Sequence, residues 1–226
     1  MDVVSPKLAQ TGAEDARETA DPALAWLLPG PIVLASASRT RRRLLDQAGI
    51  VYLADAADLD EGALRAGARE RGEDAEAAAI ALAAAKAVAI ARRRPEAVVV
   101  GADQILECSG AWFEKPNDLA TARSALLALR DRRHRLVSGV AVAQAGRCHW
   151  RHVDVATMTM RPFSQAFLAH YLETAATDAL DTVAGYRFEG PGVQLFSATE
   201  GDIFTILGLP LLALFAYLRD QGILPV

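Results

Sequence analysis

Short apolar runs alternate along the chain with longer segments in which aliphatic residues recur at helical spacing. Apolar runs bounded by turn residues predict buried strands, and the longer periodic segments predict helices. On this basis we expect strands over residues 31–36, 51–53, 97–107, 111–114, 136–144, 148–160, 193–196 and 203–207. We expect helices over residues 40–48, 75–93, 118–129, 164–173 and 211–220.

The order of these elements predicts the class of fold. Strands alternate with helices over much of the chain, which is typical of an α/β domain. Residues 136–144 and 148–160, however, flank the turn pair Ala145-Gly146 and predict an antiparallel hairpin. We therefore expect a mixed twisted sheet flanked by helices. Residues 55–73 are polar and broken by glycines, so we expect a loop or lid there.

The first 28 residues differ from the rest of the chain. They are polar, and they lack the basic-then-apolar architecture of an export signal. We expect a polar extension over residues 1–28, with a short helix over 23–28, and one domain over 29–226. No apolar run reaches the roughly 18–20 residues that a membrane-spanning helix needs. These observations predict a cytoplasmic protein that does not bind a membrane.

Composition narrows the class of partner. The chain is 52% apolar and 23% charged, which is ordinary for a globular domain, and its formal net charge is −4. Binding to a nucleic-acid backbone usually needs a broad cationic surface, so we expect no stable nucleic-acid binding. The two cysteines, Cys108 and Cys148, are too few for a disulfide framework and lack the spacing of a zinc site. Their number favours a reducing cytosol.

The first candidate for chemistry is the segment Leu34-Ala-Ser-Ala-Ser-Arg-Thr-Arg-Arg-Arg43, which joins a predicted strand to a predicted helix. At such a junction the free backbone N–H groups of the first helical turn face a ligand, and serine and arginine side chains add donors. The pattern favours an anion, above all a polyphosphate. Two alternatives are a solvated basic helix face with a serine cap and a short nucleic-acid patch over residues 39–43.

The second candidate is Asp103, which lies inside the apolar run 97–107. A carboxylate buried in such a strand is costly unless it is paired, hydrogen-bonded or bound to a metal ion. At the carboxyl end of a central strand, Asp103 would face the crevice where ligands bind in open α/β sheets. The alternative is an aspartate at the strand end that caps a turn.

Three further charged residues complete a set. Lys86 is the only lysine of its alanine-rich helix, Lys115 precedes Pro116, and Glu61 lies in the glycine-broken segment. Each of them alone is compatible with an ordinary solvated surface charge. Together with Asp103, however, they match what metal-assisted phosphoryl chemistry requires. Carboxylates hold Mg²⁺ with its waters, and cations neutralise the charge that develops on phosphate oxygens.

The order and spacing of these residues resemble the Maf family, whose members were first named septum-formation inhibitors and are now regarded as nucleotide pyrophosphatases. The resemblance covers about residues 31–222. Its ordered markers are Leu34-Ala-Ser-Ala-Ser followed by arginines, Gly49-Ile50, Asp60-Glu61, Leu82-Ala-x-x-Lys86-Ala, Gly101-Ala-Asp103, Lys115-Pro116, Gly190 and Gly208-Leu209-Pro210.

The resemblance implies an α/β fold with two lobes around a deep nucleotide cleft. It implies a hydrolase acting on acid anhydrides, which converts a nucleoside triphosphate to the monophosphate and pyrophosphate with the help of Mg²⁺ or Mn²⁺. The role it implies is sanitation of the nucleotide pool, arrest of cell division, or both. It also hints at a homodimer, for which the chain offers no independent signal.

The resemblance also implies roles for individual residues. Asp103 would be the proton acceptor, and Glu61 and Asp103 would hold the metal ion. Lys86 and Lys115 would stabilise the phosphates. Four residues of the serine/arginine loop would bind the phosphates, namely Ser36, Ser38, Arg41 and Arg42.

Three positions bear on the choice of base. Gln104 and Glu189 resemble the family branch that acts on 7-methyl-GTP, whereas the branch acting on dTTP and UTP has threonine and glutamine there. The Glu189 carboxylate can accept hydrogen bonds from the N1–H and 2-amino groups of a guanine. Thr40 stands where the 7-methyl-GTP branch has a tryptophan, and threonine supplies no stacking surface. We expect a modified or guanine-like triphosphate as substrate.

A second hypothesis, from a different class, is a non-catalytic nucleotide-binding regulator of cell division. Such a protein binds nucleotides without hydrolysing them, and it has no need of a buried carboxylate that activates water. The intact set Glu61, Lys86, Asp103 and Lys115 therefore favours the enzyme.

Overall fold

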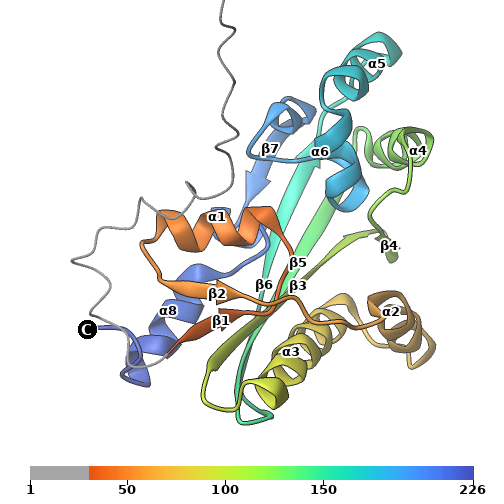
Figure 1. The fold of residues 1–226 in the computed structure, drawn as a ribbon. Helices are drawn as coiled ribbons and strands as arrows, with labels where there is room; N and C mark the ends of the chain where they lie inside the picture. Colours follow the sequence, from red (N-terminus) through yellow and green to blue (C-terminus); the bar gives the residue numbers. More distant parts are fainter. Residues whose placement is uncertain (1–30) are drawn as a thin grey trace, which may run out of the picture.

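The computed structural model describes residues 31–226 and shows a single mixed sheet with helices on both faces (Figure 1). Its strands are β1 (Ile32–Leu34), β2 (Tyr52–Ala54), β3 (Val98–Cys108), β4 (Ala111–Phe113), β5 (Arg133–Gln144), β6 (Arg147–Met160) and β7 (Phe196–Glu200). Its α-helices are α1 (Arg39–Gln47), α2 (Glu61–Glu70), α3 (Ala75–Arg93), α4 (Leu119–Leu129), α5 (Gln165–Thr174), α6 (Ala176–Asp181), α7 (Ile203–Ile206) and α8 (Leu211–Asp220). The extension predicted over residues 1–28, with its short helix, lies outside the described residues.

The strand order confirms the predicted mixed sheet. It runs β2-β1-β3-β5-β6-β7, and β4 pairs with β3 away from this path. β1 is parallel to both β2 and β3, whereas β3–β5, β5–β6 and β6–β7 are antiparallel. The hairpin predicted at Ala145-Gly146 joins β5 to β6, and both turn residues have positive φ. Within residues 31–226, no helix combines the length and the hydropathy needed to cross a bilayer.

The elements gather into two lobes that share the long strands β3, β5 and β6 (Figure 1). In one lobe, α1 and α8 cover one face of the sheet and α3 covers the other. Successive side chains of β1 point to opposite faces, so Leu34 packs against α1 and α8 whereas Val33 packs against α3. In the other lobe, α4, α5 and α6 surround a separate core that includes Leu126 and Met158. The lobes meet at the sheet.

The alanine-rich helix α3 packs unusually close to the sheet. A Cβ atom on Gly101 of β3 would lie 2.2 Å from the backbone oxygen of Ala83. A Cβ atom on Gly139 of β5 would lie 2.5 Å from the backbone of Ala79. Glycine on the strands and alanine on the helix therefore let two backbones approach. This contact brings Lys86, one turn beyond Ala83, to the sheet.

Two predicted elements are wrong, and in both cases an aspartate cap decides the structure. Residues 55–73 contain helix α2 rather than only a loop, because Asp60 accepts a hydrogen bond from the amide of Ala63 (2.9 Å). The strand predicted over 203–207 is the one-turn helix α7, whose cap Asp202 accepts from the amide of Thr205 (3.3 Å).

Smaller differences lie nearby. Most of the strand predicted over 193–196 is a 3₁₀ turn, Pro191–Leu195, and strand β7 begins at Phe196. Helix α6 and the 3₁₀ turn Val183–Gly185 were not predicted. Short apolar or polar segments of this length carry too little periodicity to separate a strand from a single helical turn.

The buried histidine His134 of β5 makes the fold sensitive to acid. Its Nε2 lies 2.8 Å from the hydroxyl of Tyr186, and burial lowers its pKa from 6.5 to about 4. The unfolded chain takes up this proton near pH 6.5, whereas the folded chain does so only near pH 4. Stability from this residue is therefore present above pH 6.5 and is lost as the pH falls toward 4. We expect a loss of about 3 kcal/mol in the free energy of unfolding.

Urea unfolding at pH 7 and pH 4 tests this expectation. His134→Gln should lose less free energy of unfolding between the two pH values than the wild-type protein, since glutamine does not titrate. His170→Gln, at an exposed position of α5, is the matched control and should behave as wild type. Equal losses in the wild-type protein and His134→Gln would show that His134 does not set the acid limit.

Candidate active site

The candidate site lies at an interruption in the edge of the sheet. β1 pairs with residues 98–100 of β3, and β4 pairs with residues 106–108. No strand of the described residues pairs with the intervening stretch of β3 on that side. Asp103 and Gln104 lie in this gap and line a cavity of about 370 Å³. The strand predicted over 97–107 is confirmed, because β3 runs through Asp103 to Cys108, so the alternative of an aspartate that caps a turn at the strand end is wrong. The crevice at Asp103 exists because β1 ends early.

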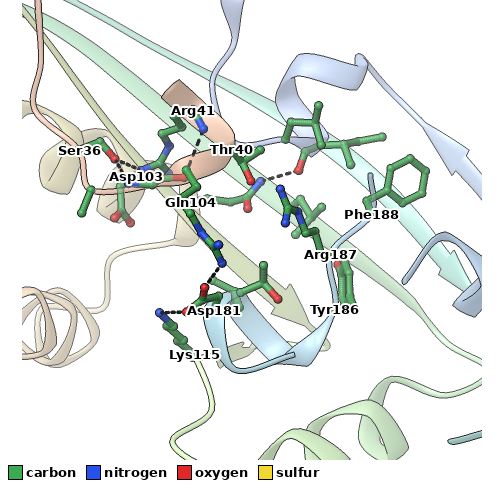
Figure 2. Close-up of a pocket in the computed structure, with 18 of the residues that line it drawn as sticks. Ser36, Thr40, Arg41, Asp103, Gln104, Lys115, Asp181, Tyr186, Arg187 and Phe188 are labelled. Carbon is green, nitrogen blue, oxygen red and sulfur yellow. Dashed lines mark hydrogen bonds and ion pairs between the residues drawn. The ribbon is translucent and has the colours of Figure 1, made fainter. Parts of the chain in front are cut away.

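The cavity is lined by residues of both lobes and has the size of a small-molecule site. Figure 2 shows Ser36, Arg41, Asp103 and Gln104 on one side of it. The side chains of Tyr186, Arg187 and Phe188 lie on another side, and Lys115 lies next to Asp181 on a third (Figure 2). The second lobe thus faces the serine/arginine loop across the cavity.

Asp103 is the most deeply buried carboxylate of the cavity, with 2% of its surface exposed. Lys86 Nζ lies 2.8 Å from Asp103 Oδ1 and 2.8 Å from Glu61 Oε1. Arg65 Nη2 lies 3.1 and 3.2 Å from the two Asp103 oxygens and 3.6 Å from Glu61 Oε2. Two cations thus compensate two carboxylates, which is what burial of Asp103 requires. The structure brings together three of the four predicted catalytic residues.

The serine/arginine loop is held by its own side chains. Ser38 caps α1, because its Oγ accepts a hydrogen bond from the amide of Arg41 (3.3 Å). The buried Arg41 guanidinium donates to the backbone oxygens of Gly208 (2.8 Å) and Ala102 (3.0 Å) and to Ser36 Oγ (3.1 Å). Burial lowers the pKa of Arg41, and the nearby carboxylates act in the opposite direction. Arg41 therefore ties α1 to the unpaired edge of β3.

Two predicted site residues are placed differently. Arg42, the next residue of α1, is not among the side chains that line the cavity. Lys115 lines the cavity but is separate from the Asp103 cluster: its Nζ lies 3.5 Å from Asp181 Oδ1, and it is more than half exposed. Asp181 also accepts a hydrogen bond from Arg39. One carboxylate of α6 therefore bridges the loop of one lobe and a lysine of the other.

The residues predicted to select the base form a second connected group. Thr40 Oγ1 donates to Glu189 Oε1 (2.8 Å), and Arg187 Nε donates to the same oxygen (2.9 Å). Arg187 is held in turn by Asp178 (3.0 Å). Burial acts to raise the pKa of Glu189, but hydrogen bonds from its own amide, Arg187 and Thr40 outweigh burial and lower it. Glu189 is thus a fixed carboxylate, whose Oε1 accepts from both Thr40 and Arg187.

Gln104, the third predicted specificity residue, is turned toward α7. Its Nε2 lies within hydrogen-bond distance of three acceptors, the backbone oxygens of Thr205 (3.1 Å) and Ile206 (3.1 Å) and Ser138 Oγ (3.0 Å), which its two N–H groups share. Its amide therefore fixes the one-turn helix against β3, and its side chain forms part of the cavity wall.

The oxygen ligands of the site suit a hard divalent cation. Within residues 31–226, no group of three or more His, Cys, Asp or Glu side chains is arranged to hold a metal ion. Glu61 and Asp103, however, both contact Lys86 Nζ at 2.8 Å, so oxygens of the two carboxylates lie close enough together to bind one cation. Mg²⁺ commonly binds through one or two carboxylates and completes its shell with water and substrate phosphate. The pair fits that mode of binding.

Several cavity residues were not predicted from the sequence. Arg65 follows Glu61 by four residues, a spacing that places two side chains on the same face of a helix, so a correct prediction of α2 would have found it. Asp178, Asp181 and Arg187 lie in α6 and the segment that follows, where no pattern marked them.

The comparison with known protein families agrees with this geometry. A family model described as Maf-like protein matches residues 31–221, which include all the residues that line the cavity. The chain belongs to the Maf-like protein family. The family predicted from the ordered sequence markers is therefore confirmed.

Relatives of this Maf-like chain carry two different names. A protein of Paramagnetospirillum magneticum named nucleoside triphosphate pyrophosphatase is 47% identical over 190 residues, which cover 84% of this chain and 98% of the relative. One of Granulibacter bethesdensis with the same name is 47% identical over 195 residues, covering 86% and 99%. A 7-methyl-GTP pyrophosphatase of Rhizobium etli is 42% identical over 191 residues, covering 84% and 96%.

Proposed function

We propose that the protein hydrolyses a nucleoside triphosphate to the monophosphate and pyrophosphate. The observation that carries this proposal is Asp103, a buried carboxylate at the unpaired edge of β3 and at hydrogen-bond distance from Lys86. The cavity around it is lined by further cations suited to a polyphosphate. The names of relatives over 40% identical support the same reaction class.

In the proposed reaction, water attacks the α-phosphorus and the bond from this phosphorus to the α–β bridging oxygen breaks. Asp103 accepts the proton that the attacking water loses. Pyrophosphate leaves with the bridging oxygen and its electron pair. Lys86 and the loop cations stabilise the negative charge that develops on the phosphate oxygens. A bound Mg²⁺ or Mn²⁺, held by Glu61 and Asp103, would supply charge that polarises the phosphoryl group.

The geometry supports a guanine-like base. Glu189 Oε1 is engaged by Thr40 and Arg187, which fixes the carboxylate and leaves Oε2 as an acceptor for the N1–H or 2-amino group of a guanine. Thr40 is hydrogen-bonded and offers no aromatic surface to a cationic methylated base. We therefore propose that GTP or a related purine triphosphate is a better substrate than 7-methyl-GTP. The biological role that we propose for this hydrolysis is sanitation of the nucleotide pool, arrest of cell division, or both.

Glu189→Gln tests the choice of base. Glutamine replaces an anionic acceptor with a neutral amide, so we expect kcat/KM for GTP to fall by roughly 10- to 100-fold, the value of a hydrogen bond to a charged group. The kcat/KM for ATP should change little, since adenine has neither the N1–H nor the 2-amino group that would donate to Glu189. Glu173→Gln, at an exposed position of α5, is the control. An equal loss with both nucleotides would mean that Glu189 does not read the base.

The function itself is tested by pyrophosphate release from a panel of standard and modified triphosphates with Mg²⁺ or Mn²⁺. Turnover of at least one nucleotide, with monophosphate as the second product, is the expected result. If every nucleotide binds and none is hydrolysed, the non-catalytic regulator is the better description of the protein.

A further inference from the structure

The charged side chains of the cavity are paired with one another. They comprise the cations Arg39, Arg41, Arg65, Lys86, Lys115 and Arg187 and the carboxylates Glu61, Asp103, Asp178, Asp181 and Glu189. Each of these cations contacts a carboxylate, except Arg41, which donates to backbone and serine oxygens. A polyphosphate can therefore bind these cations only by replacing acceptors that the protein itself provides.

Arg65 differs from the other cations of the cavity because it contacts the oxygens of both Asp103 and Glu61 and reaches Asp103 Oδ2. Its Nη2 contacts both oxygens of Asp103, and it is the one donor to Asp103 Oδ2 among the described residues. It also lies 3.6 Å from Glu61 Oε2. Arg65 thus covers the same two carboxylates that are proposed to hold the metal ion and to accept the proton. Neither task is open to Asp103 Oδ2 while the guanidinium stays in place.

The position of Arg65 in α2 allows its side chain to move. α2 begins at Glu61, after the connection 55–60 from β2, and its contact with the core is made by Ala68. The Arg65 side chain is 19% exposed and lines the cavity. A rotation of this long side chain therefore moves its charge from the carboxylates into the cavity without a change in the sheet.

We propose that Arg65 is a further substrate-binding residue, which exchanges Asp103 for a phosphate oxygen of the nucleotide when the metal ion binds. A guanidinium and a divalent cation compete for the same carboxylate oxygens, and an arginine released into this cavity meets a polyphosphate that it can bind through two N–H groups. Metal and nucleotide binding therefore favour each other. This inference rests on the proposed function.

The first part of the test is metal binding without nucleotide. Mn²⁺ is titrated into the full-length protein and followed by electron paramagnetic resonance of the free ion. Arg65→Gln removes the competing charge, so we expect Mn²⁺ to bind about three- to tenfold more tightly than in the wild-type protein. Arg71→Gln is the matched control, because Arg71 ends the same helix and pairs with Glu73 outside the cavity. It should bind Mn²⁺ as wild type.

The second part is nucleotide binding. In Arg65→Gln we expect the KM for the best triphosphate to rise by roughly 10-fold or more, because a charge-assisted contact to phosphate is lost. Arg65→Lys should have a KM between those of the wild-type protein and Arg65→Gln, since lysine keeps the positive charge but lacks the paired N–H groups of the guanidinium. Thermal unfolding of each variant shows whether it is folded under the assay conditions.

Unchanged Mn²⁺ affinity in a folded Arg65→Gln overturns the exchange. An unchanged KM in the same variant overturns the role in substrate binding. If the wild-type protein hydrolyses no triphosphate, the proposed function itself fails. If the wild-type protein hydrolyses a triphosphate, but Arg65→Gln has the same Mn²⁺ affinity and the same KM as Arg71→Gln, only the inference about Arg65 fails. Weaker Mn²⁺ binding in Arg65→Gln would show that Arg65 helps to hold the carboxylates for the metal rather than competing for them, and it would likewise overturn the exchange.

Discussion

Asp103→Asn is expected to lower kcat for triphosphate hydrolysis by about 10²- to 10⁴-fold, the usual contribution of a positioned general base. Asparagine has the same shape but cannot accept the proton of the attacking water. The fold should survive, because Lys86 keeps Glu61 as a partner at 2.8 Å when the neighbouring charge is removed. Steady-state pyrophosphate release at saturating nucleotide measures the effect.

Asp55→Asn is the matched control for this substitution. Asp55 also pairs with two cations, Arg93 and Arg94, but it does not line the cavity. We expect it to keep wild-type turnover. If Asp103→Asn retains turnover within a fewfold of Asp55→Asn, Asp103 is not the proton acceptor, and the proposed mechanism is wrong.

The same variant separates the enzyme from the non-catalytic regulator. Binding of a triphosphate analogue with a methylene group between the α- and β-phosphorus is expected to persist in Asp103→Asn, since the phosphate-binding loop and Arg41 are untouched. A regulator would show this binding together with negligible turnover in the wild-type protein. The enzyme shows binding in both proteins and turnover only in the wild type.

The core of the site could be predicted from the sequence because its signals are local. Asp103 stands out as a charge inside a β-branched run, and Lys86 as the one lysine of an alanine-rich helix. Burial makes such charges costly unless they meet, and the structure places them 2.8 Å apart. The fold class followed in the same way from long periodic segments such as α3 and the β5–β6 hairpin.

The rest of the site depends on contacts that no local pattern encodes. Arg65 was missed because glycines at 62 and 67 predict a loop, whereas the Asp60 cap and the buried face of Ala68 make a helix. Asp181 meets Arg39 across 142 positions of the chain, and Glu189 meets Thr40 across 149. Pairings at that separation are decided by how the two lobes pack around the sheet.

Lys86→Met is expected to destabilise the protein by about 3 kcal/mol, since removing one partner of a buried ion pair leaves an uncompensated charge. The Lys86 side chain is 7% exposed and touches both Glu61 and Asp103. Arg65 remains on Asp103, so the loss should fall at the lower end of the usual range of about 3–5 kcal/mol. Turnover should fall as well, because phosphate loses a cation and Asp103 loses its support.

A double-mutant cycle identifies the cause of this loss. In the Asp103→Asn background, Lys86→Met should cost much less free energy of unfolding, because the deeply buried charge is already gone and Glu61 is 39% exposed and can be hydrated. Urea unfolding of the four proteins gives the coupling energy. An equal cost in both backgrounds would assign the effect to packing of the lysine stem against α3 and the sheet. A much smaller cost of Lys86→Met in the Asp103→Asn background would instead show that Lys86 is needed for folding because it compensates the buried charge of Asp103. The carboxylate at the gap in the sheet would then explain why Lys86 serves both stability and chemistry.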